Sequence, residues 1–320
     1  MFRFILLLSL ISFSNIINAQ KKLRSIAFYN VENYFDTIDG VNDDAEFLPE
    51  SENKWNTEKY TEKRNHINQV FDQLNCPLII GMCEIENEMV LRDLNFHSEK
   101  RHDYGVVHFE SPDARGIDVA LLYDSTALKL VESGKISFTL PAQDKPSSRD
   151  IVWGKFKRKK DTLIVLVNHW PSRRGGTEES EPNRLTAAQS ARIFIDSVML
   201  SNQEAKIILM GDLNDTPVDK APKMIEEKLS PMIKNSSGEF GGTHNYKETW
   251  DVLDHIFVSP NLLKKQKGFK VFNESGKIHS FPFLLTEYKG QTVPFRTYGG
   301  SKYLGGYSDH LPVSIEVSIP

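Results

Sequence analysis

Short apolar runs alternate along this chain with longer segments in which apolar residues recur every three or four positions. The short runs predict strands, and the longer amphipathic segments predict helices. We expect strands at residues 25–30, 78–84, 104–109, 117–123, 128–139, 150–156, 162–169, 205–211, 253–259 and 311–317, and helices at 58–74, 88–97, 183–201 and 219–227. Many strands with a few interposed helices predict a layered α/β fold with two packed sheets. Because no linker divides residues 20–320, we expect one domain there.

Residues 1–19 follow a different pattern. One basic residue, Arg3, precedes a run of Phe, Ile and Leu, and the segment ends with Ala19 before Gln20. This order is typical of a secretory signal peptide that is cleaved between Ala19 and Gln20. The alternative, a membrane anchor, is disfavoured because polar residues interrupt the apolar run, which is short for a bilayer span. We therefore expect a secreted or periplasmic protein whose mature chain has no transmembrane segment.

The net charge of the chain is −4. A mildly acidic protein cannot hold a polyanion through its overall charge, so nucleic-acid binding would require a local basic patch or a bound metal. The two cysteines, Cys76 and Cys83, lie at the entrance of one predicted strand and inside it. An extended chain separates them beyond disulfide reach, which predicts two free thiols.

Candidate catalytic residues follow the ends of apolar strands. The segment IILMGDLNDTP (207–217) carries an apolar run to Gly211 and continues with Asp212 and Asn214. Residues two positions apart in an extended chain point the same way, so the carboxylate can orient or deprotonate a water while the amide holds a phosphate oxygen. The alternative is a simple turn, because Asp, Asn, Gly and Pro are common in turns.

Acidic residues follow two other predicted strands. YNVEN places Asn30 and Glu32 two positions apart, and IIGMCEIEN places Glu84 at the end of a buried run. A buried carboxylate is costly without a positive partner, and hard divalent cations such as Mg²⁺ prefer oxygen ligands. Glu84, with Glu32 nearby, is therefore a candidate metal ligand. The alternative is a surface glutamate at a strand end, which is our interpretation of Glu86 and Glu88.

The segment VNHWPSRRGG joins a predicted strand to a loop. Asn168 and His169 end the strand, and Arg173 and Arg174 follow. A histidine titrates near neutral pH, so His169 is a candidate general acid. The two arginines can clamp a phosphate, although they suit a solvated loop equally well.

Two more segments place an acid or an acid–histidine pair before a strand. WDVLDHIFVS contains Asp254, and GYSDHLPVSI contains Asp309 and His310. A carboxylate on one strand can orient an imidazole on the next, raise its proton affinity and keep it cationic against a phosphate.

Taken in order, YNVEN, CEIEN, GIDVALLY, NHW, GDLNDTP, LDHIFVS and YSDHLPV resemble the motifs of the endonuclease/exonuclease/phosphatase superfamily. This superfamily includes pancreatic deoxyribonuclease, apurinic endonucleases and neutral sphingomyelinases. The similarity extends from about residue 24 to residue 318. Each motif is weak alone, but their order and spacing are specific. The resemblance implies a four-layered α/β sandwich of two mixed sheets flanked by helices, and hydrolysis that depends on Mg²⁺ or Mn²⁺, with Ca²⁺ as an alternative.

The resemblance also implies roles for individual residues. Glu84 matches the principal metal ligand, Glu32 and Asp309 lie on the metal side, and Asn30 binds phosphate beside them.

The remaining roles concern the water and the phosphate. Asp212 matches the residue that aligns or activates water, and Asn214 its phosphate-binding partner. Asp254 matches the acid that bonds His310, which holds the scissile phosphate. His169 matches a histidine of deoxyribonucleases and sphingomyelinases, where apurinic endonucleases have tyrosine.

The substrate is less constrained. The aromatic residues of segment 277–307 can stack on bases, contact lipid or pack as an insertion into the core. Together with Asn168, Arg173, Arg174 and Arg296 as phosphate contacts, they favour a nuclease acting on DNA or RNA, with no stable protein partner. The alternatives are a sphingomyelinase-type phospholipase C, a phosphomonoesterase and, least favoured because every expected catalytic position is filled, a non-catalytic binding protein.

Overall fold

The computed structural model describes residues 23–320 except 42, 102, 142–144, 147–148 and 265–267. The expected signal peptide, residues 1–19, lies outside the described residues and stays a prediction. None of the helices in the described part of the chain has the length and apolar character needed to span a membrane.

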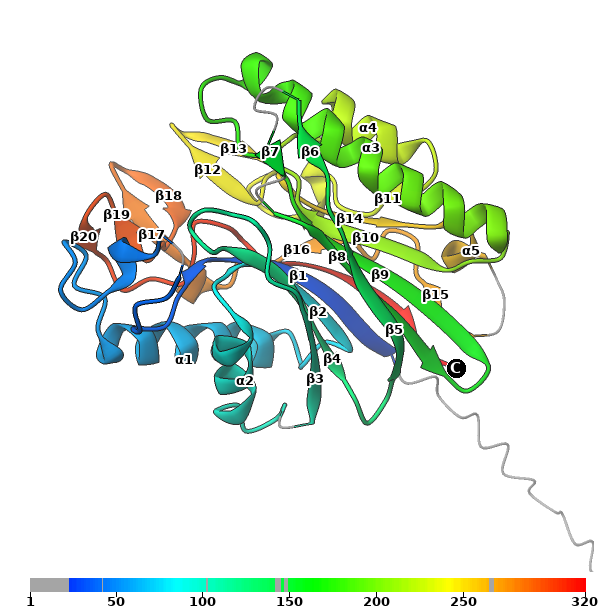
Figure 1. Ribbon diagram of the computed structural model, residues 1–320, viewed down its shortest axis with the longest axis horizontal. Coiled ribbons are helices and arrows are strands. Elements are labelled where there is room, and N and C mark those ends of the chain that lie inside the picture. Colours follow the sequence, from blue (N-terminus) through cyan, green and yellow to red (C-terminus); the bar gives the residue numbers. More distant parts are fainter. Residues whose placement is uncertain (1–22, 42, 102, 142–144, 147–148, 265–267) are drawn as a thin grey trace, which may run out of the picture.

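Two mixed sheets form the centre of the fold (Figure 1). The first contains, in spatial order, β15 (Lys270–Val271), β21 (Val313–Ser318), β1 (Leu23–Tyr34), β2 (Ile79–Ile85), β4 (Asp118–Asp124) and β3 (Tyr104–His108), with β16 (Lys277–Ile278) also paired to β21. The second contains β11 (Ser230–Pro231), β14 (Asp254–Val258), β10 (Ile207–Asp212), β9 (Asp161–His169), β8 (Ile151–Arg158) and β5 (Lys129–Ile136). Only β1–β2 and β9–β10 are parallel among the described strand pairs.

Helices cover the outer face of each sheet, which confirms the predicted four-layered α/β sandwich (Figure 1). On the first sheet lie α1 (Thr57–Gln73) and α2 (Glu88–Phe96), and on the second lie α3 (Thr177–Ser201) and α4 (Lys220–Glu226). The remaining short elements are α5 (Pro260–Leu263), the 3₁₀ helices η1 (Ala45–Phe47), η2 (Asn235–Ser237) and η3 (Pro282–Leu284), and the hairpins β6–β7 (Thr139–Leu140, Lys145–Pro146), β12–β13 (His244–Tyr246, Thr249–Asp251), β17–β18 (Leu285–Tyr288, Gln291–Pro294) and β19–β20 (Tyr298–Gly299, Lys302–Tyr303).

Strand β10 shows why its sequence is a continuous apolar run. Ile208 and Met210 pack into the core between the two sheets. Ile207 and Leu209 point the other way, into a second cluster beneath α3. A strand buried on both faces cannot alternate apolar with polar residues. The polar residues therefore appear only where the strand ends, at Asp212 and beyond.

Three elements differ from the sequence prediction by more than two residues. The strand expected at 25–30 is longer, because β1 continues to Tyr34. The helix expected at 183–201 begins earlier, at Thr177, although Pro182 lies inside it. Arg184 stabilises the first turns of this helix, because its guanidinium donates to the Thr177 carbonyl at 2.8 Å and to the Ser180 hydroxyl at 2.7 Å. The strand expected at 128–139 is divided, since β5 ends at Ile136 and a short separate strand follows. The prediction that both cysteines are free is confirmed.

The aromatic segment 277–307 packs largely against the core. Phe281, Phe283 and Phe295 contact the main apolar cluster, to which the buried Tyr307 belongs. The core-packing interpretation therefore holds for these four rings. Tyr288 is different, because 60% of it is exposed at the turn of the β17–β18 hairpin.

Candidate active site

The predicted catalytic residues of the second sheet lie side by side where neighbouring strands of that sheet begin or end. His169 ends β9 and Asp212 ends β10, and these two residues are register partners across the parallel pair. Asp254 begins the antiparallel strand β14 and is the partner of Asp212 on the other side. The parallel strands β9 and β10 end on the same side of the sheet, and the antiparallel strand β14 begins there. Three motifs far apart in sequence therefore meet on this side.

Asn30 connects this edge to the first sheet. It belongs to β1, and its Nδ2 lies 3.1 Å from Asp212 Oδ2 and 3.4 Å from Glu84 Oε1. Glu84 lies in β2, the parallel neighbour of β1. One amide therefore joins a residue from each sheet, and the two sheets contribute to one site.

Irregular backbone shapes the ends of these strands. Glu32, Glu84 and Asn214 have positive φ angles of 52°, 61° and 51°, and strand pairing shifts register near the first two. Such conformations are uncommon for residues other than glycine, and they gather at functional sites. Local hydrogen bonds support them: the Asn33 amide donates to Glu84 Oε2 at 3.0 Å, and the Asn214 amide donates to Asp212 Oδ1 at 2.9 Å.

His310 is held in its charged form. Its Nδ1 lies 2.7 Å from Asp254 Oδ2, and its Nε2 lies 3.8 Å from Asp212 Oδ2. Burial alone would lower the pKa of His310, but the carboxylates of Asp254 and Asp212 raise the pKa well above its ordinary value. An imidazolium held in this way is suited to bind a phosphate oxygen.

Asp212 and His169 form the other half of the site. Burial raises the pKa of Asp212 to about 7, although the neighbouring His310 opposes this shift. His169 Nε2 lies 3.7 Å from Asp212 Oδ2. Burial and the cations Arg149 and Arg115 lower the pKa of His169 well below its ordinary value. Without a bound phosphate, the His169 imidazole is therefore a neutral hydrogen-bonding group. The buried Nδ1 of His169 has no hydrogen-bond partner among the described residues, and a buried polar atom of this kind is suited to bind a ligand.

Three carboxylates, those of Glu84, Glu32 and Asp309, are the predicted metal ligands. Arg296 joins two of them, with 3.0 Å contacts from its guanidinium to Glu32 Oε1 and Asp309 Oδ2. Burial and the neighbouring Asp309 together raise the pKa of Glu32 to about 7, against the opposing effect of Lys63 and Arg296. Arg296 already pairs with two of these carboxylates, and the three together are not one of the groups of described side chains whose ligand atoms lie within 4.8 Å of one another. Oxygen ligands of this kind suit a hard divalent ion, but these side chains would have to move closer together to hold one. Arg296 thus contacts the metal-side carboxylates, and its expected phosphate contact stays a prediction.

Two residues at this site, the buried Lys63 and the half-buried His244, were not identified from the sequence. Lys63 of α1 donates to the Thr297 hydroxyl and the Tyr307 carbonyl, both at 2.6 Å. Burial lowers its pKa to about 8, and Glu32, Asp309 and Glu84 oppose this. Lys63 therefore supplies positive charge beneath the carboxylates. An isolated lysine in an amphipathic helix pattern gives no signal of this role.

His244 is the other residue that the sequence did not reveal. It begins the β12–β13 hairpin, and its Nε2 lies 4.0 Å from Asp309 Oδ2. Its ring centroid is 4.7 Å from that of His310. Together, His244, Asp309 and His310 form one of several groups whose side chains could hold a metal ion. Burial and His310 lower the pKa of His244 to about 4.

Other predicted phosphate contacts make internal interactions. Asn168 is fully buried, its Nδ2 donates to the Met210 carbonyl at 3.2 Å, and its Oδ1 accepts from Trp170 Nε1 at 3.1 Å. Asn214 Nδ2 donates to the Trp170 carbonyl at 3.0 Å. These two amides hold the strand ends in place, and their contact with phosphate stays a prediction.

The two predicted arginines differ from each other. Arg173 donates to the Asn214 carbonyl at 2.8 Å and to Asp219 Oδ2 at 2.7 Å, so it stabilises the loop that follows Asp212. Arg174 is exposed. A phosphate role for either residue stays a prediction.

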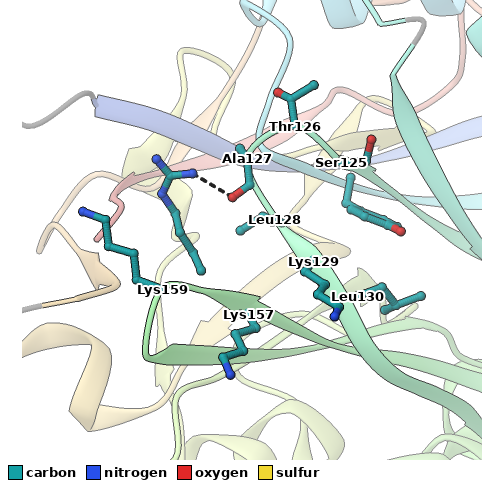
Figure 2. Close-up of a pocket in the computed structure, with 10 residues that line it drawn as sticks. Ser125, Thr126, Ala127, Leu128, Lys129, Leu130, Lys157 and Lys159 are labelled. Carbon is teal, nitrogen blue, oxygen red and sulfur yellow. Dashed lines mark hydrogen bonds between the residues drawn. The ribbon is translucent and has the colours of Figure 1, made fainter.

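Two cavities lie at different ends of the molecule. The first, of about 560 Å³, is lined by residues that include Ser125–Leu130, Lys157 and Lys159 (Figure 2). Arg158 also lines it and donates from its guanidinium to the Ala127 carbonyl at 2.8 Å. It lies at the β8–β9 turn, the opposite end of β9 from His169. The second, of about 810 Å³, includes Arg296 and Asp309 in its lining and therefore adjoins the candidate site.

Comparisons with known proteins agree with this geometry. The profile of the endonuclease/exonuclease/phosphatase family matches residues 25–319, whereas no curated protein matches the chain. Among solved structures, a family protein from Bacteroides thetaiotaomicron has a TM-score of 0.60 at 18% identity, covering 92% of this chain and 94% of its own. A mannosyl-6-phosphatase from the same organism has a TM-score of 0.60 at 17% identity, and the match covers 92% of this chain and 99% of the phosphatase. Danio rerio TDP2 in complex with a single-strand DNA product has a TM-score of 0.57 at 13% identity, and the match covers 92% of this chain and 99% of TDP2.

At these identities the solved structures establish the fold alone. The profile match, in contrast, extends over nearly all of the described chain. It covers every strand end that supplies a side chain to the site, from Asn30 to His310. The chain therefore belongs to the endonuclease/exonuclease/phosphatase family.

Proposed function

We propose that this protein is a metal-dependent phosphoester hydrolase that acts on nucleic-acid phosphodiesters. Members of its family are generally phosphoester hydrolases and typically depend on divalent metal. The observation that carries the proposal is the environment of Asp212 Oδ2, which lies 3.1 Å from Asn30 Nδ2 and within 3.8 Å of Nε2 of both His169 and His310. A base, two imidazoles and an amide thus face one point.

The side chains divide the work of hydrolysis. Asp212 accepts the proton of the attacking water, and its raised pKa suits a general base near neutral pH. His310, kept cationic by Asp254, binds a non-bridging phosphate oxygen and stabilises the charge that builds up there. His169 donates a hydrogen bond to the phosphate, whose negative charge raises the proton affinity of this histidine and allows it to protonate the leaving oxygen.

The candidate ions are Mg²⁺ and Mn²⁺, held by Glu84 with Glu32 and Asp309. When bound, such an ion neutralises phosphate charge and stabilises the leaving oxygen. Lys63 and Arg296 lie within electrostatic range of the same carboxylates and limit their mutual repulsion. A site whose ligands are all carboxylates favours these hard ions over softer metals.

A phosphomonoesterase acting on small phosphorylated molecules is the second candidate. It is favoured by the size of the cavity beside Asp309, because about 810 Å³ is typical of a small-molecule site. The two candidates differ in the charge and size of the best substrate. A monoesterase would cleave p-nitrophenyl phosphate and sugar phosphates faster than bis(p-nitrophenyl) phosphate or an oligonucleotide.

The purified protein tests both candidates directly. We expect it to hydrolyse bis(p-nitrophenyl) phosphate and DNA or RNA with Mg²⁺ or Mn²⁺, and to lose this activity with a chelator. His310→Ala should abolish hydrolysis, whereas His97→Ala, at an exposed histidine after α2, should not. Activity that survives the chelator would refute the metal mechanism, and activity on sphingomyelin alone would refute the nuclease assignment.

We also propose that the protein is secreted or periplasmic. The support is the pattern of residues 1–19, a basic residue and an apolar run before Ala19. Determining the N-terminus of the protein isolated from its own cells tests this proposal. A mature chain beginning at Gln20 is expected, and a chain that retains residues 1–19 in the cytoplasm would refute it.

A further inference from the structure

Two hairpins beside the candidate site share the same turn design. In β12–β13 the two turn residues, Lys247 and Glu248, have φ angles of 46° and 72°, and in β17–β18 the turn residues Lys289 and Gly290 have φ angles of 51° and 77°. Positive φ at both positions is the signature of a type I′ hairpin turn. In each hairpin a tyrosine ends the first strand immediately before the lysine: Tyr246 in one and Tyr288 in the other.

Both tyrosines project into solvent. Tyr246 is 64% exposed and Tyr288 is 60% exposed, although large aromatic side chains gain most from burial. Each ring also has a cation beside it, since Lys247 Nζ and Lys289 Nζ each lie 5.2 Å from the centroid of the preceding tyrosine ring. Neither ring belongs to an apolar cluster of the core. Packing in the core therefore does not explain why an aromatic ring stands at each tip.

The two tips open onto one cavity that leads to the candidate site. The cavity of about 810 Å³ is lined by Tyr246 and Lys247 from one hairpin, by Tyr288 and Lys289 from the other, and by Arg296. Strands β12 and β18 contact each other, and Figure 1 shows the two hairpins side by side at the same end of the molecule. A ligand in the cavity can touch both tips and also contact Arg296 and Asp309 of the candidate site.

The charges around the cavity narrow the choice of ligand. Its lining includes four cations and three carboxylates: Lys247, Lys289, Arg296 and Lys302, and Glu248, Glu287 and Asp309. This near balance cannot hold a polyanion by charge alone, and a rigid duplex would present its backbone rather than its stacked bases. A lipid surface is disfavoured because the tips end in charged residues rather than in an apolar group.

We infer that the Tyr246–Lys247 and Tyr288–Lys289 tips bind single-stranded nucleic acid, with bases stacked on the tyrosines and adjacent phosphates near the lysines. This inference rests on the proposed function and names its substrate class. Aromatic rings interleaved with cations are the usual means of holding unpaired bases, because every base offers a flat face. Because Asp309 lines the same cavity, a strand held by the tips can continue toward the adjacent His310.

Binding without turnover tests the inference separately from catalysis. We would measure fluorescence anisotropy of a labelled oligothymidylate in EDTA, with an abasic oligomer of the same length and a duplex as comparison probes. Tyr246→Ala and Tyr288→Ala should each weaken oligothymidylate binding by roughly 5- to 100-fold and leave abasic binding unchanged. Tyr246→Phe and Tyr288→Phe should retain binding, because phenylalanine also stacks. Phe96→Ala, which removes an exposed ring on α2, is the matched control.

Kinetics supply the second readout. With Mg²⁺ or Mn²⁺, the alanine variants should raise KM for a single-stranded oligonucleotide and leave kcat within about twofold of the wild type, since the tips contact bases and not the reacting phosphorus. Unchanged binding in both alanine variants, or equal losses for the abasic and duplex probes, would overturn the inference. So would efficient turnover of mannose 6-phosphate that depends on the two tyrosines. Wild-type protein inactive on every phosphoester would instead overturn the proposed function, whatever the binding result.

Discussion

His310 Nδ1 and Asp254 Oδ2 lie 2.7 Å apart, and this hydrogen bond links the two sheets. His310 precedes β21 of the first sheet, whereas Asp254 begins β14 of the second. Both side chains are almost completely buried, so the contact is protected from solvent. The bond therefore orients the imidazole and joins the two sheets at the site.

Asp254→Asn should separate orientation from charge at this contact. The amide preserves the shape of the side chain but removes the negative charge, so the pKa of His310 should fall. We expect kcat to drop by roughly 100- to 10,000-fold. The pKa can be followed by NMR titration of the His310 ring. Asp196→Asn, at an exposed aspartate on α3, is the control, and a normal kcat in Asp254→Asn would contradict the assigned role.

The pH dependence of hydrolysis should follow Asp212. A general base works only when deprotonated, and the pKa of Asp212 is raised to about 7, so kcat/KM should increase with pH through this region. A bound divalent cation lowers that pKa, which places the midpoint at about 7 or below. At higher pH the rate should fall as His310 loses its proton. A kcat/KM for bis(p-nitrophenyl) phosphate that decreases from about pH 5 to 7 would exclude Asp212 as the base.

Glu84→Gln should weaken metal binding. The substitution removes one negative charge from an oxygen-rich site but preserves the side-chain size, and we expect a loss of affinity of at least about tenfold. Isothermal titration with Mn²⁺ measures this without any substrate. Glu88→Gln, which changes an exposed glutamate near the start of α2, should bind Mn²⁺ like the wild type. Equal affinity in both variants would remove Glu84 from the metal site.

Gly211→Ala should destabilise the protein more than an ordinary glycine substitution. A Cβ at this position would lie 2.2 Å from the Asn168 carbonyl oxygen, which is backbone of the adjacent strand and cannot rotate away. We expect a loss of about 1–3 kcal/mol. Gly300→Ala is a useful comparison, because its φ is also positive but no atom lies within 4 Å of the added Cβ. Thermal unfolding of both variants measures the difference, and similar melting temperatures would show that the strand contact is not limiting.

The sequence predicted the fold and much of the candidate site for one physical reason. Strands buried on both faces have long apolar runs, so a polar residue such as Asp212 or Glu84 indicates that the strand is ending. The same pattern was misleading at Glu86, which was interpreted as a surface residue and is buried. The same logic located His169 and Asp254, which the structure brings next to Asp212. Their assigned roles stay predictions, because no bound ligand or measured activity tests them.

The remaining features depend on tertiary contacts that no local pattern encodes. Lys63 lies on an amphipathic helix where a lysine would ordinarily be solvated, yet it is 1% exposed because segment 297–307 covers it. His244 is a hairpin residue whose importance follows only from its distance to Asp309. Arg296 was identified as a cation near the site, but its ion pairs with two carboxylates of the predicted metal set were not foreseeable.

Because the two sheets share the candidate site, a change in their alignment should abolish hydrolysis before the chain unfolds. Asn30 and His310 come with one sheet, and Asp212 and Asp254 come with the other, so neither sheet alone contains a working set of groups. A small slip of one sheet on the other would separate these pairs while leaving the helices and strands intact. Hydrolysis should therefore report on sheet alignment, and in a urea titration we expect activity to disappear before the circular dichroism signal of the folded chain does.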